Sequence, residues 1–344
     1  MVKRKGRSAF GRFCYALRYR IGEYALRGFV ASLPYVPYRW VMLFTCSMAR
    51  VTFWLLWSYR KRMEENVAAV FAGEIPAARN REDLVWRAWL NFARGVLETT
   101  AVMHFSKERI LSTVALEGEE HIKQALEMGK GVLALSAHLG SFTMIGVRLA
   151  VSGYPFSVVV KQPADESFTK LVDGYRAQLG IHTISAKPRR EAVRGILKAL
   201  RDNRIVLVIA DEFKSGDVIV DFLGMKVPAP RGPATLALRT GAATLPMFAT
   251  RGAAGALTLK VGPPIAPLLR EDPEASVIAT TELYTRHIEA AIRKFPDQWN
   301  WLGLPRRDRK LSRAEMARRR KQAHAKTASR SVPSDRAGTD ASSP

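Results

Sequence analysis

The stretch VLALSAHLGSFTMIGVR, from Val132 to Arg148, decides the fold. Its first five residues form a short, largely apolar run, and a Lys-Gly pair precedes them, so residues 132–136 are expected to form a buried strand. Apolar side chains then recur at helical spacing at Phe142, Ile145 and Leu149. The stretch therefore predicts a strand that turns directly into a helix, which is the unit from which α/β folds are built.

The same unit recurs on both sides of this stretch. Strands are expected at 114–116, 132–136, 156–161, 181–184, 205–210, 218–222, 226–227, 245–249 and 256–261, and helices at 58–73, 83–104, 119–128, 166–178, 190–201, 231–240 and 275–295. In the first of these helices, Asn66 is expected to be exposed and Val67 to face inward. Alternation of strand and helix predicts an α/β fold with a mostly parallel sheet that helices cover on both faces.

His138 lies at the carboxyl end of the predicted strand, beside the N-terminus of the helix that follows. Open α/β sheets bind ligands at this end, and the first backbone N–H groups of a helix lack partners and favour negative charge. An imidazole that takes a proton from a hydroxyl, next to donors that hold an oxyanion, is the minimum equipment for acyl transfer. On spacing alone, a hydrogen-bonded structural histidine is the alternative.

The segment from Ala137 to Thr143 resembles the first motif of the bacterial lipid A biosynthesis acyltransferases, relatives of the glycerolipid acyltransferases. That motif reads His-x-Gly-Asn-Trp-Glu. The resemblance implies that His138 is the catalytic base and that backbone N–H groups near Gly140 and Ser141 hold the oxyanion. Thr143 occupies the position of the family's acid, and its hydroxyl can hydrogen-bond the ring but cannot stabilise an imidazolium by charge.

Asp211 belongs to a second segment that resembles the family. The family has Asp-Gln after a strand, then a Phe-Phe-Gly turn and a Gly-Pro that enters a helix; here these are Asp211-Glu212, Phe222-Leu223-Gly224 and Gly232-Pro233. Asp211 follows a strand, and we expect it to replace the missing acid if the fold brings it within about 3 Å of His138. The alternative is a structural role, in which Asp211 caps a turn or pairs with an arginine.

Three further positions resemble binding or closing motifs of the same family. Lys161 ends a predicted strand where the family has a basic residue that holds a phosphate or polar head group, and a solvated lysine is the alternative. Two arginines are candidates for binding phosphates: Arg231, at a predicted helix start, and Arg239. Residues 296–301, PDQWNW, are similar to the family's closing Pro-x-Gln-Trp/Tyr-x-Trp motif. The remaining histidines show no metal-ligand spacing, so no metal and no cofactor are expected.

The two ends of the chain carry most of its formal net charge of +23. Residues 1–62 contain 13 Lys and Arg against one acidic residue, and residues 305–344 contain 12 against four. The residues between are nearly balanced, which disfavours a nucleic-acid groove in the fold. The two cysteines, Cys14 and Cys46, show no pairing pattern and indicate a reducing compartment.

An apolar segment from Trp40 to Trp57 follows the basic N-terminus. Aromatic residues stand near both of its ends, as in a membrane-interface belt, and an Arg-Lys-Arg run follows at 60–62. Arg50 near the middle costs about 2.5–3.5 kcal/mol in a spanning helix. A span, an interfacial helix and an ordinary helix packed on the domain all stay open; the first two place the protein on a membrane.

Together these patterns divide the chain into a membrane-anchoring region at 1–57, an acyltransferase-like α/β domain at 58–304 and a basic, largely disordered tail at 305–344. The resemblance implies an O-acyltransferase at the cytoplasmic face of the inner membrane. Its donor is expected to be an acyl carrier protein or coenzyme A thioester, and its acceptor a lipid A precursor or a lysophospholipid-like lipid. Anionic membrane surface is the expected further partner. The alternative is a relative that binds lipid or carrier protein without catalysis, and Thr143 is its main support.

Overall fold

The computed structural model describes residues 20–304, apart from 26, 30, 34, 73–77, 103–104, 163–164, 214–215 and 253–254. The predicted tail at 305–344 and residues 1–19 of the basic N-terminus lie outside the described residues. The strands are β1 (Val114–Glu117), β2 (Val132–Ser136), β3 (Phe156–Val160), β4 (Ile181–Ser185), β5 (Ile205–Ile209), β6 (Val218–Phe222), β7 (Met225–Ala229), β8 (Ala243–Arg251) and β9 (Leu257–Val261). The helices are α2 (Tyr38–Leu55), α3 (Trp57–Val70), α4 (Ala78–Ala101), α5 (Lys107–Thr113), α6 (Glu119–Glu127), α7 (Thr143–Val151), α8 (Glu166–Gln178), α9 (Arg189–Arg201), α10 (Gly232–Thr240) and α11 (Pro273–Lys294).

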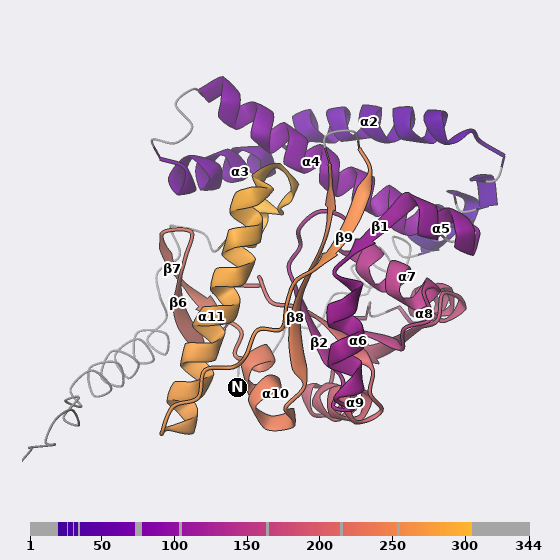
Figure 1. Ribbon diagram of the computed structural model, residues 1–344. Coiled ribbons are helices and arrows are strands. Elements are labelled where there is room, and N and C mark those ends of the chain that lie inside the picture. Colours follow the sequence, from indigo (N-terminus) through magenta and orange to yellow (C-terminus); the bar gives the residue numbers. More distant parts are fainter. Residues whose placement is uncertain are drawn as a thin grey trace, which may run out of the picture.

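Seven strands form the main sheet, in the order β1-β9-β8-β2-β5-β3-β4 (Figure 1). Neighbouring strands run parallel except at β8 and β9, which pair antiparallel. The predicted, mostly parallel sheet is therefore confirmed, and the antiparallel pair is the feature that the alternating pattern did not reveal. All five residues of β2 are buried, as expected for a central strand that is covered on both faces.

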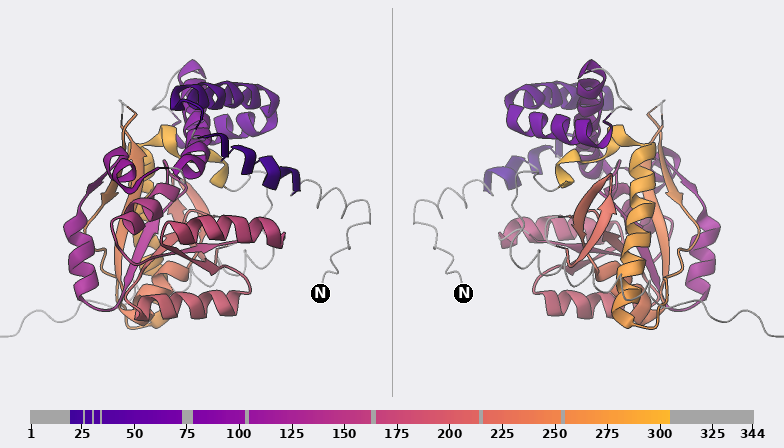
Figure 2. Two further views of the ribbon diagram at one scale, coloured as in Figure 1. Left: turned by 90° about the vertical axis from the view of Figure 1, so that its right-hand side faces the viewer. Right: turned by 90° about the vertical axis from the view of Figure 1, so that its left-hand side faces the viewer.

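Helices cover both faces of this sheet. Leu133 and Leu135 of β2 belong to the hydrophobic cluster that includes α9, α10 and α11, whereas Val132 and Ala134 belong to the cluster that includes α6 and α7. The alternation follows from the two-residue period of a strand. The helices α2, α3 and α4 lie together at one end of the molecule (Figure 2).

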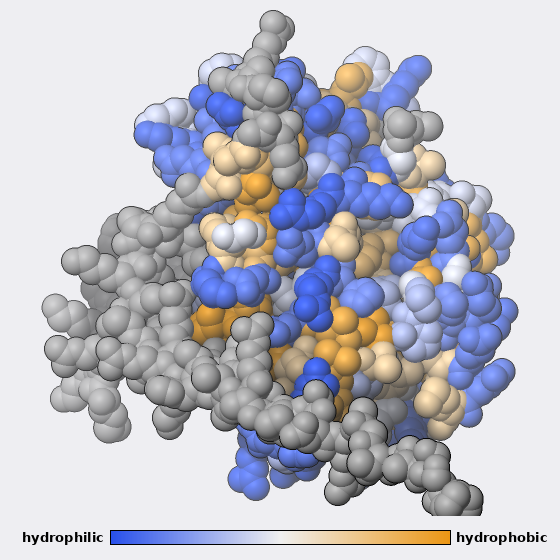
Figure 3. Space-filling model, turned by 60° about the vertical axis from the view of Figure 1, so that its left-hand side comes forward, coloured by the Kyte–Doolittle hydropathy of each residue, from blue (hydrophilic) through white to orange (hydrophobic). Residues whose placement is uncertain are grey.

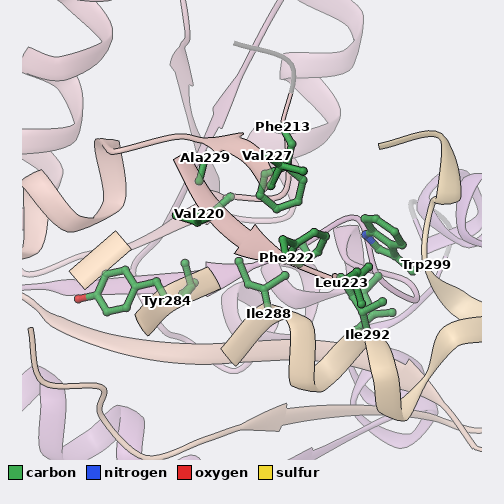
Figure 4. Packing of buried hydrophobic residues seen from close by; sticks show 14 of the residues in the cluster. Phe213, Val220, Phe222, Leu223, Val227, Ala229, Tyr284, Ile288, Ile292 and Trp299 are labelled. Atoms are coloured by element: carbon green, nitrogen blue, oxygen red, sulfur yellow. The ribbon is translucent and has the colours of Figure 1, made fainter. Parts of the chain in front are cut away.

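The β6–β7 hairpin packs against α11, apart from the main sheet (Figure 4). Its Phe222 ring lies 4.3 Å from the ring of Phe213 and 5.8 Å from that of Trp299, centroid to centroid. The cluster is buried, and it fixes the loop that follows β5 against the C-terminal motif. This packing matters for the site because Asp211 lies in that loop.

Among the described residues, no single helix is long and apolar enough to cross a membrane. The segments 39–55 and 57–70 reach the required hydropathy only together, and the chain bends by 86° between them. The prediction of membrane-associated helices stays a prediction.

Two details differ from the sequence-based expectations. Asn66 was expected to be exposed but is buried, because its amide donates to the carbonyl oxygen of Trp301 at 2.7 Å. The helix α5 was not predicted; it begins after Ser106, whose side chain accepts a hydrogen bond from the Arg109 amide as an N-cap.

Candidate active site

His138 and Asp211 meet at the carboxyl end of the sheet. Strands β2 and β5 pair in parallel with Ser136 opposite Ile209, so the residues two positions further on also lie opposite each other. The Nδ1 atom of His138 lies 2.8 Å from Oδ1 of Asp211. The register of two neighbouring strands thus brings together residues that are 73 positions apart in the chain.

Both oxygens of the Asp211 carboxylate accept hydrogen bonds. It is 1% exposed, and its Oδ2 atom accepts hydrogen bonds from the backbone N–H of His138 at 2.9 Å and from the indole N–H of Trp299 at 2.8 Å. A carboxylate only accepts, so the proton of the neutral imidazole lies on Nδ1. The other ring nitrogen, Nε2, then carries a lone pair, and the side chain of His138 is 34% exposed. This is the arrangement of a general base oriented by a buried acid.

The loop after His138 is shaped by close backbone contacts. Gly140 has φ +60°, and a Cβ atom there would lie 2.2 Å from the carbonyl oxygen of Ala249, so only glycine fits. The Gly140 amide donates to the carbonyl of Gln298, and the Ser141 amide donates to that of Ala249, both at 2.9 Å. The two amides expected to hold an oxyanion are therefore already bonded within the protein.

Ser141 is buried at 3% exposure and points away from solvent. Its hydroxyl donates to Oε2 of Glu98 at 2.8 Å, and Arg251 forms an ion pair with the same carboxylate. Glu98 on α4 thus anchors the loop that follows His138, and Arg251 on β8 holds Glu98 in turn. The sequence analysis missed both residues; the available signal was a glutamate next to the apolar Leu97 on a long helix.

Thr143, at the position of the family's acid, is the first residue of α7. Its hydroxyl oxygen lies 2.6 Å from that of Thr99 on α4, and Thr99 in turn donates to the carbonyl of Gly95 at 2.6 Å. The sequence analysis did not single out Thr99.

An apolar cavity of about 760 Å³ opens beside His138. Strands β3 and β5 pair only as far as Val158 and Leu207, and the cavity is lined by the residues beyond that point, Val159, Val160, Val208 and Ile209. His138, Thr99, Thr143 and Lys161 also line it. Because two neighbouring strands separate at their carboxyl ends, an apolar space extends from the imidazole into the interior of the domain.

Arg231 is not among the residues that line the cavity, although its neighbours Pro230 and Gly232 are. Its guanidinium forms a bidentate ion pair with the carboxylate of Glu274, with N–O distances of 3.0 and 2.7 Å. Arg239 is exposed on α10. Among the residues that the structure describes, no cluster of His, Cys, Asp or Glu could hold a metal ion.

An oriented imidazole at the opening of an apolar cavity is the arrangement expected of an enzyme that activates a polar group next to a long apolar substrate. The chain belongs to the bacterial lipid A biosynthesis acyltransferase family, which it matches over residues 10–306. It is therefore an acyltransferase, and the resemblance found in the sequence motifs is confirmed.

Curated relatives come from the same group of enzymes. The chain is 27% identical over 244 residues to phosphatidylinositol mannoside acyltransferase of Mycolicibacterium smegmatis, a match that covers 70% of this chain and 78% of that relative. The phosphatidylinositol mannoside acyltransferase of Mycobacterium tuberculosis is 29% identical over 191 residues, or 54% of this chain and 60% of the relative. A lipid A biosynthesis acyltransferase of Haemophilus influenzae is 24% identical over 229 residues, which cover 65% and 69% of the two chains.

Proposed function

We propose that this protein transfers a fatty acyl chain from the thioester of an acyl carrier protein or coenzyme A to a hydroxyl of a lipid, with His138 as the general base. The observation that carries the proposal is the 2.8 Å contact between His138 Nδ1 and Asp211 Oδ1 at the opening of the apolar cavity. The names of the relatives supply the acceptor class, since they act on phosphatidylinositol mannoside and in lipid A biosynthesis. A lipid A precursor or a lysophospholipid-like lipid is the proposed acceptor.

The chemistry needs one proton transfer in each direction. Nε2 of His138 takes the proton of the acceptor hydroxyl while its oxygen attacks the thioester carbonyl carbon. The tetrahedral oxyanion collapses to the new ester and releases the thiolate, which takes the proton back from the imidazolium. Asp211 keeps the Nδ1 proton in place and stabilises the imidazolium by its charge, a task that Thr143 cannot perform.

The oxyanion is assigned to the N-terminus of α7. The amides of Gly140 and Ser141 are bonded to carbonyls, and no side chain caps α7. The amides of Phe142 and Thr143 have no acceptor in the described part of the chain, and both residues line the cavity. Two such amides at the positive end of a helix dipole are suited to a developing negative charge.

The acyl chain is assigned to the cavity, whose volume of about 760 Å³ lies in the usual range for small-molecule binding sites. Lys161, exposed where β3 ends, lines this cavity and is proposed to bind a phosphate of the donor or acceptor. Gly140 and Ser141 are assigned to shaping the loop, and Arg231 to holding α10 against α11 through Glu274.

Residues on α2 and the start of α3 support attachment to a membrane surface. Trp40, Phe44, Trp54, Leu55 and Trp57 are all more than half exposed. Cations lie over three of these aromatic rings: Arg39 over Trp40, Arg60 over Trp54 and Lys61 over Trp57. Further apolar patches, separated by hydrophilic side chains, lie on the surface of the side shown in Figure 3. The exposed aromatic and apolar side chains of α2 and α3, with cations beside them, suit the headgroup layer of a bilayer.

The proposal places residues 1–57 on the cytoplasmic face of the inner membrane and the α/β domain, 58–304, beside it. The basic end regions, including 305–344, add attraction to anionic lipid, worth about 1 kcal/mol for each well-placed Lys or Arg.

Comparison of lipids tests the function as a whole. Mass spectrometry of a deletion strain is expected to show a lipid that has lost one acyl chain, and expression of the wild-type chain restores it. Supplying the purified protein with that lipid and with acyl carrier protein or coenzyme A thioesters then identifies the donor. An unchanged lipid profile, with no turnover of either donor, contradicts the proposal.

A further inference from the structure

The cavity beside His138 reaches down to the start of β3. Phe156, the first residue of β3, lines the cavity and is 0% exposed. In the sheet, Phe156 lies opposite Ile205 of β5, and that residue lies opposite Val132 of β2. Val132 precedes His138 by six residues. At about 3.3 Å per residue, Phe156 therefore lies about 20 Å from His138 along the strand direction, and it forms the floor of the cavity.

Gly146 on α7 borders the same part of the cavity. A Cβ atom at Gly146 would lie 2.6 Å from Cε1 of the Phe156 ring, 3.1 Å from Cδ1 and 3.3 Å from Cζ. Non-bonded carbon atoms prefer a separation of about 3.5–4.0 Å, so the ring already occupies the place that a side chain at position 146 needs.

The backbone of Gly146 does not itself require glycine. The residue lies within the α-helix α7, where glycine is unfavourable relative to alanine. What glycine provides at this position is space, because it allows the Phe156 ring to lie directly against α7. The ring consequently leaves the interior of the cavity open above it.

We propose that Gly146 and Phe156 together determine the length of the acyl chain that the enzyme transfers. The inference rests on the proposed function, in which His138 lies beside the thioester and the acyl chain extends into the cavity. A lipid tail in a bilayer spans about 15 Å, half of a hydrocarbon layer about 30 Å thick. The floor at Phe156 is therefore at the depth where the end of a tail of this length makes contact.

G146A is expected to shift the preference to shorter chains. The added methyl group displaces the Phe156 ring, and the cavity is the space beside this buried ring into which it can move. A chain that reaches the floor in the wild type then no longer fits completely. Its kcat/KM is expected to fall roughly fourfold for each methylene group that loses its place in the cavity, whereas shorter thioesters keep their rate.

F156L is expected to have the opposite effect, because leucine is shorter than phenylalanine and lowers the floor. Thioesters longer by one or two methylene groups are expected to gain roughly fourfold in kcat/KM for each group that becomes buried. The double variant G146A/F156L has room for the methyl group at position 146. Its chain-length profile is expected to return toward that of the wild type, since residues in contact do not act additively.

Two other helix glycines provide matched controls. At Gly174 on α8 a Cβ atom would meet nothing within 4 Å, and at Gly195 on α9 it would lie 3.0 Å from Cγ2 of Ile184. None of these three residues lines the cavity. G174A therefore tests alanine in a helix, and G195A tests crowding of a buried side chain. Both are expected to keep the wild-type chain-length profile.

Two measurements on each variant test the proposal. Transfer from saturated acyl thioesters, decanoyl to stearoyl, gives the chain-length profile of the reaction. Isothermal titration calorimetry with the corresponding free fatty acids gives the profile of the cavity without turnover. Thermal unfolding identifies the variants that fold.

The proposal is overturned if folded G146A prefers the same chain length as the wild type, or if the wild type binds no fatty acid. It is also overturned if G146A/F156L keeps the profile of G146A. A purely structural role of Gly146 changes the unfolding temperature and leaves both profiles unchanged. Failure of the proposed function has a different signature: the wild type itself transfers no acyl chain, while fatty-acid binding still reports the position of the floor.

Discussion

Replacement of Asp211 by asparagine probes the assigned base most informatively, because the side chain keeps its shape. Oδ2 accepts from the His138 amide and the Trp299 indole, so the asparagine oxygen must take the Oδ2 position to keep both bonds. Its NH2 group then faces Nδ1 of His138, where Oδ1 lies now at 2.8 Å. Two N–H groups cannot bond, and the ring therefore takes the tautomer with its proton on Nε2, which removes the base.

The expected loss follows from that change of tautomer. A corresponding substitution in serine proteases lowers kcat by about 10⁴. D211N is therefore expected to lose about 10³- to 10⁴-fold in kcat, equal to about 4–5.5 kcal/mol in the activation free energy. The two bonds to the Oδ2 position survive and the third only reverses its direction, so the free energy of unfolding is expected to fall by only about 1–3 kcal/mol.

The assay follows free thiol released from acyl thioester donors, alongside thermal unfolding of the same preparations. D221N is the matched control, because Asp221 on β6 is 71% exposed, pairs with Lys226, and lies outside the cavity lining. Its turnover is expected to equal that of the wild type. A folded D211N enzyme with a kcat within threefold of the wild type refutes the role given to Asp211.

Three further variants test other parts of the account. W299F removes a hydrogen bond to the buried Asp211 carboxylate. It is expected to slow turnover roughly tenfold, measured by thiol release, and to lower the free energy of unfolding by about 1.5–3 kcal/mol, measured by circular dichroism melts. T143E is expected to bring no gain in rate, because Asp211 already supplies the carboxylate, and a clear gain would show that the native site is only partly equipped. In sedimentation with phosphatidylglycerol vesicles, F44S/L55S is expected to bind at least tenfold more weakly than the wild type, because it buries less apolar surface in the bilayer. The control L269S, at an exposed leucine outside α2, is expected to bind like the wild type. Equal binding of the wild type and both variants argues against α2 as the attachment site.

Much of the fold could be predicted because its signals are local. The apolar run of β2, the breaker before it and the helical spacing after it each lie within a few residues, and the structure places β2 and α7 where those signals indicate. The antiparallel β9 is different. Its own residues resemble those of any buried strand, and its direction shows only in its pairing, antiparallel with β8 and parallel with the edge strand β1.

The site could be predicted only in part. Proximity of His138 and Asp211 was a conditional expectation, since both follow strands, but only the pairing of β2 with β5 sets the distance. The partners of the loop were hidden, because Gln298 and Ala249 reach it from distant segments and use backbone carbonyls. Thr99 and Glu98 were missed for the same reason: their roles depend on where α4 crosses the loop.

The central claim is that the imidazole of His138 activates the acceptor hydroxyl. The most direct measurement compares acyl transfer by the wild type, H138A and H182A, where His182 is an exposed histidine on β4. H138A is expected to lose about 10²- to 10⁴-fold in kcat while still binding the acyl thioester in the cavity, and H182A is expected to behave as the wild type. Transfer by H138A at a rate close to that of the wild type contradicts the account.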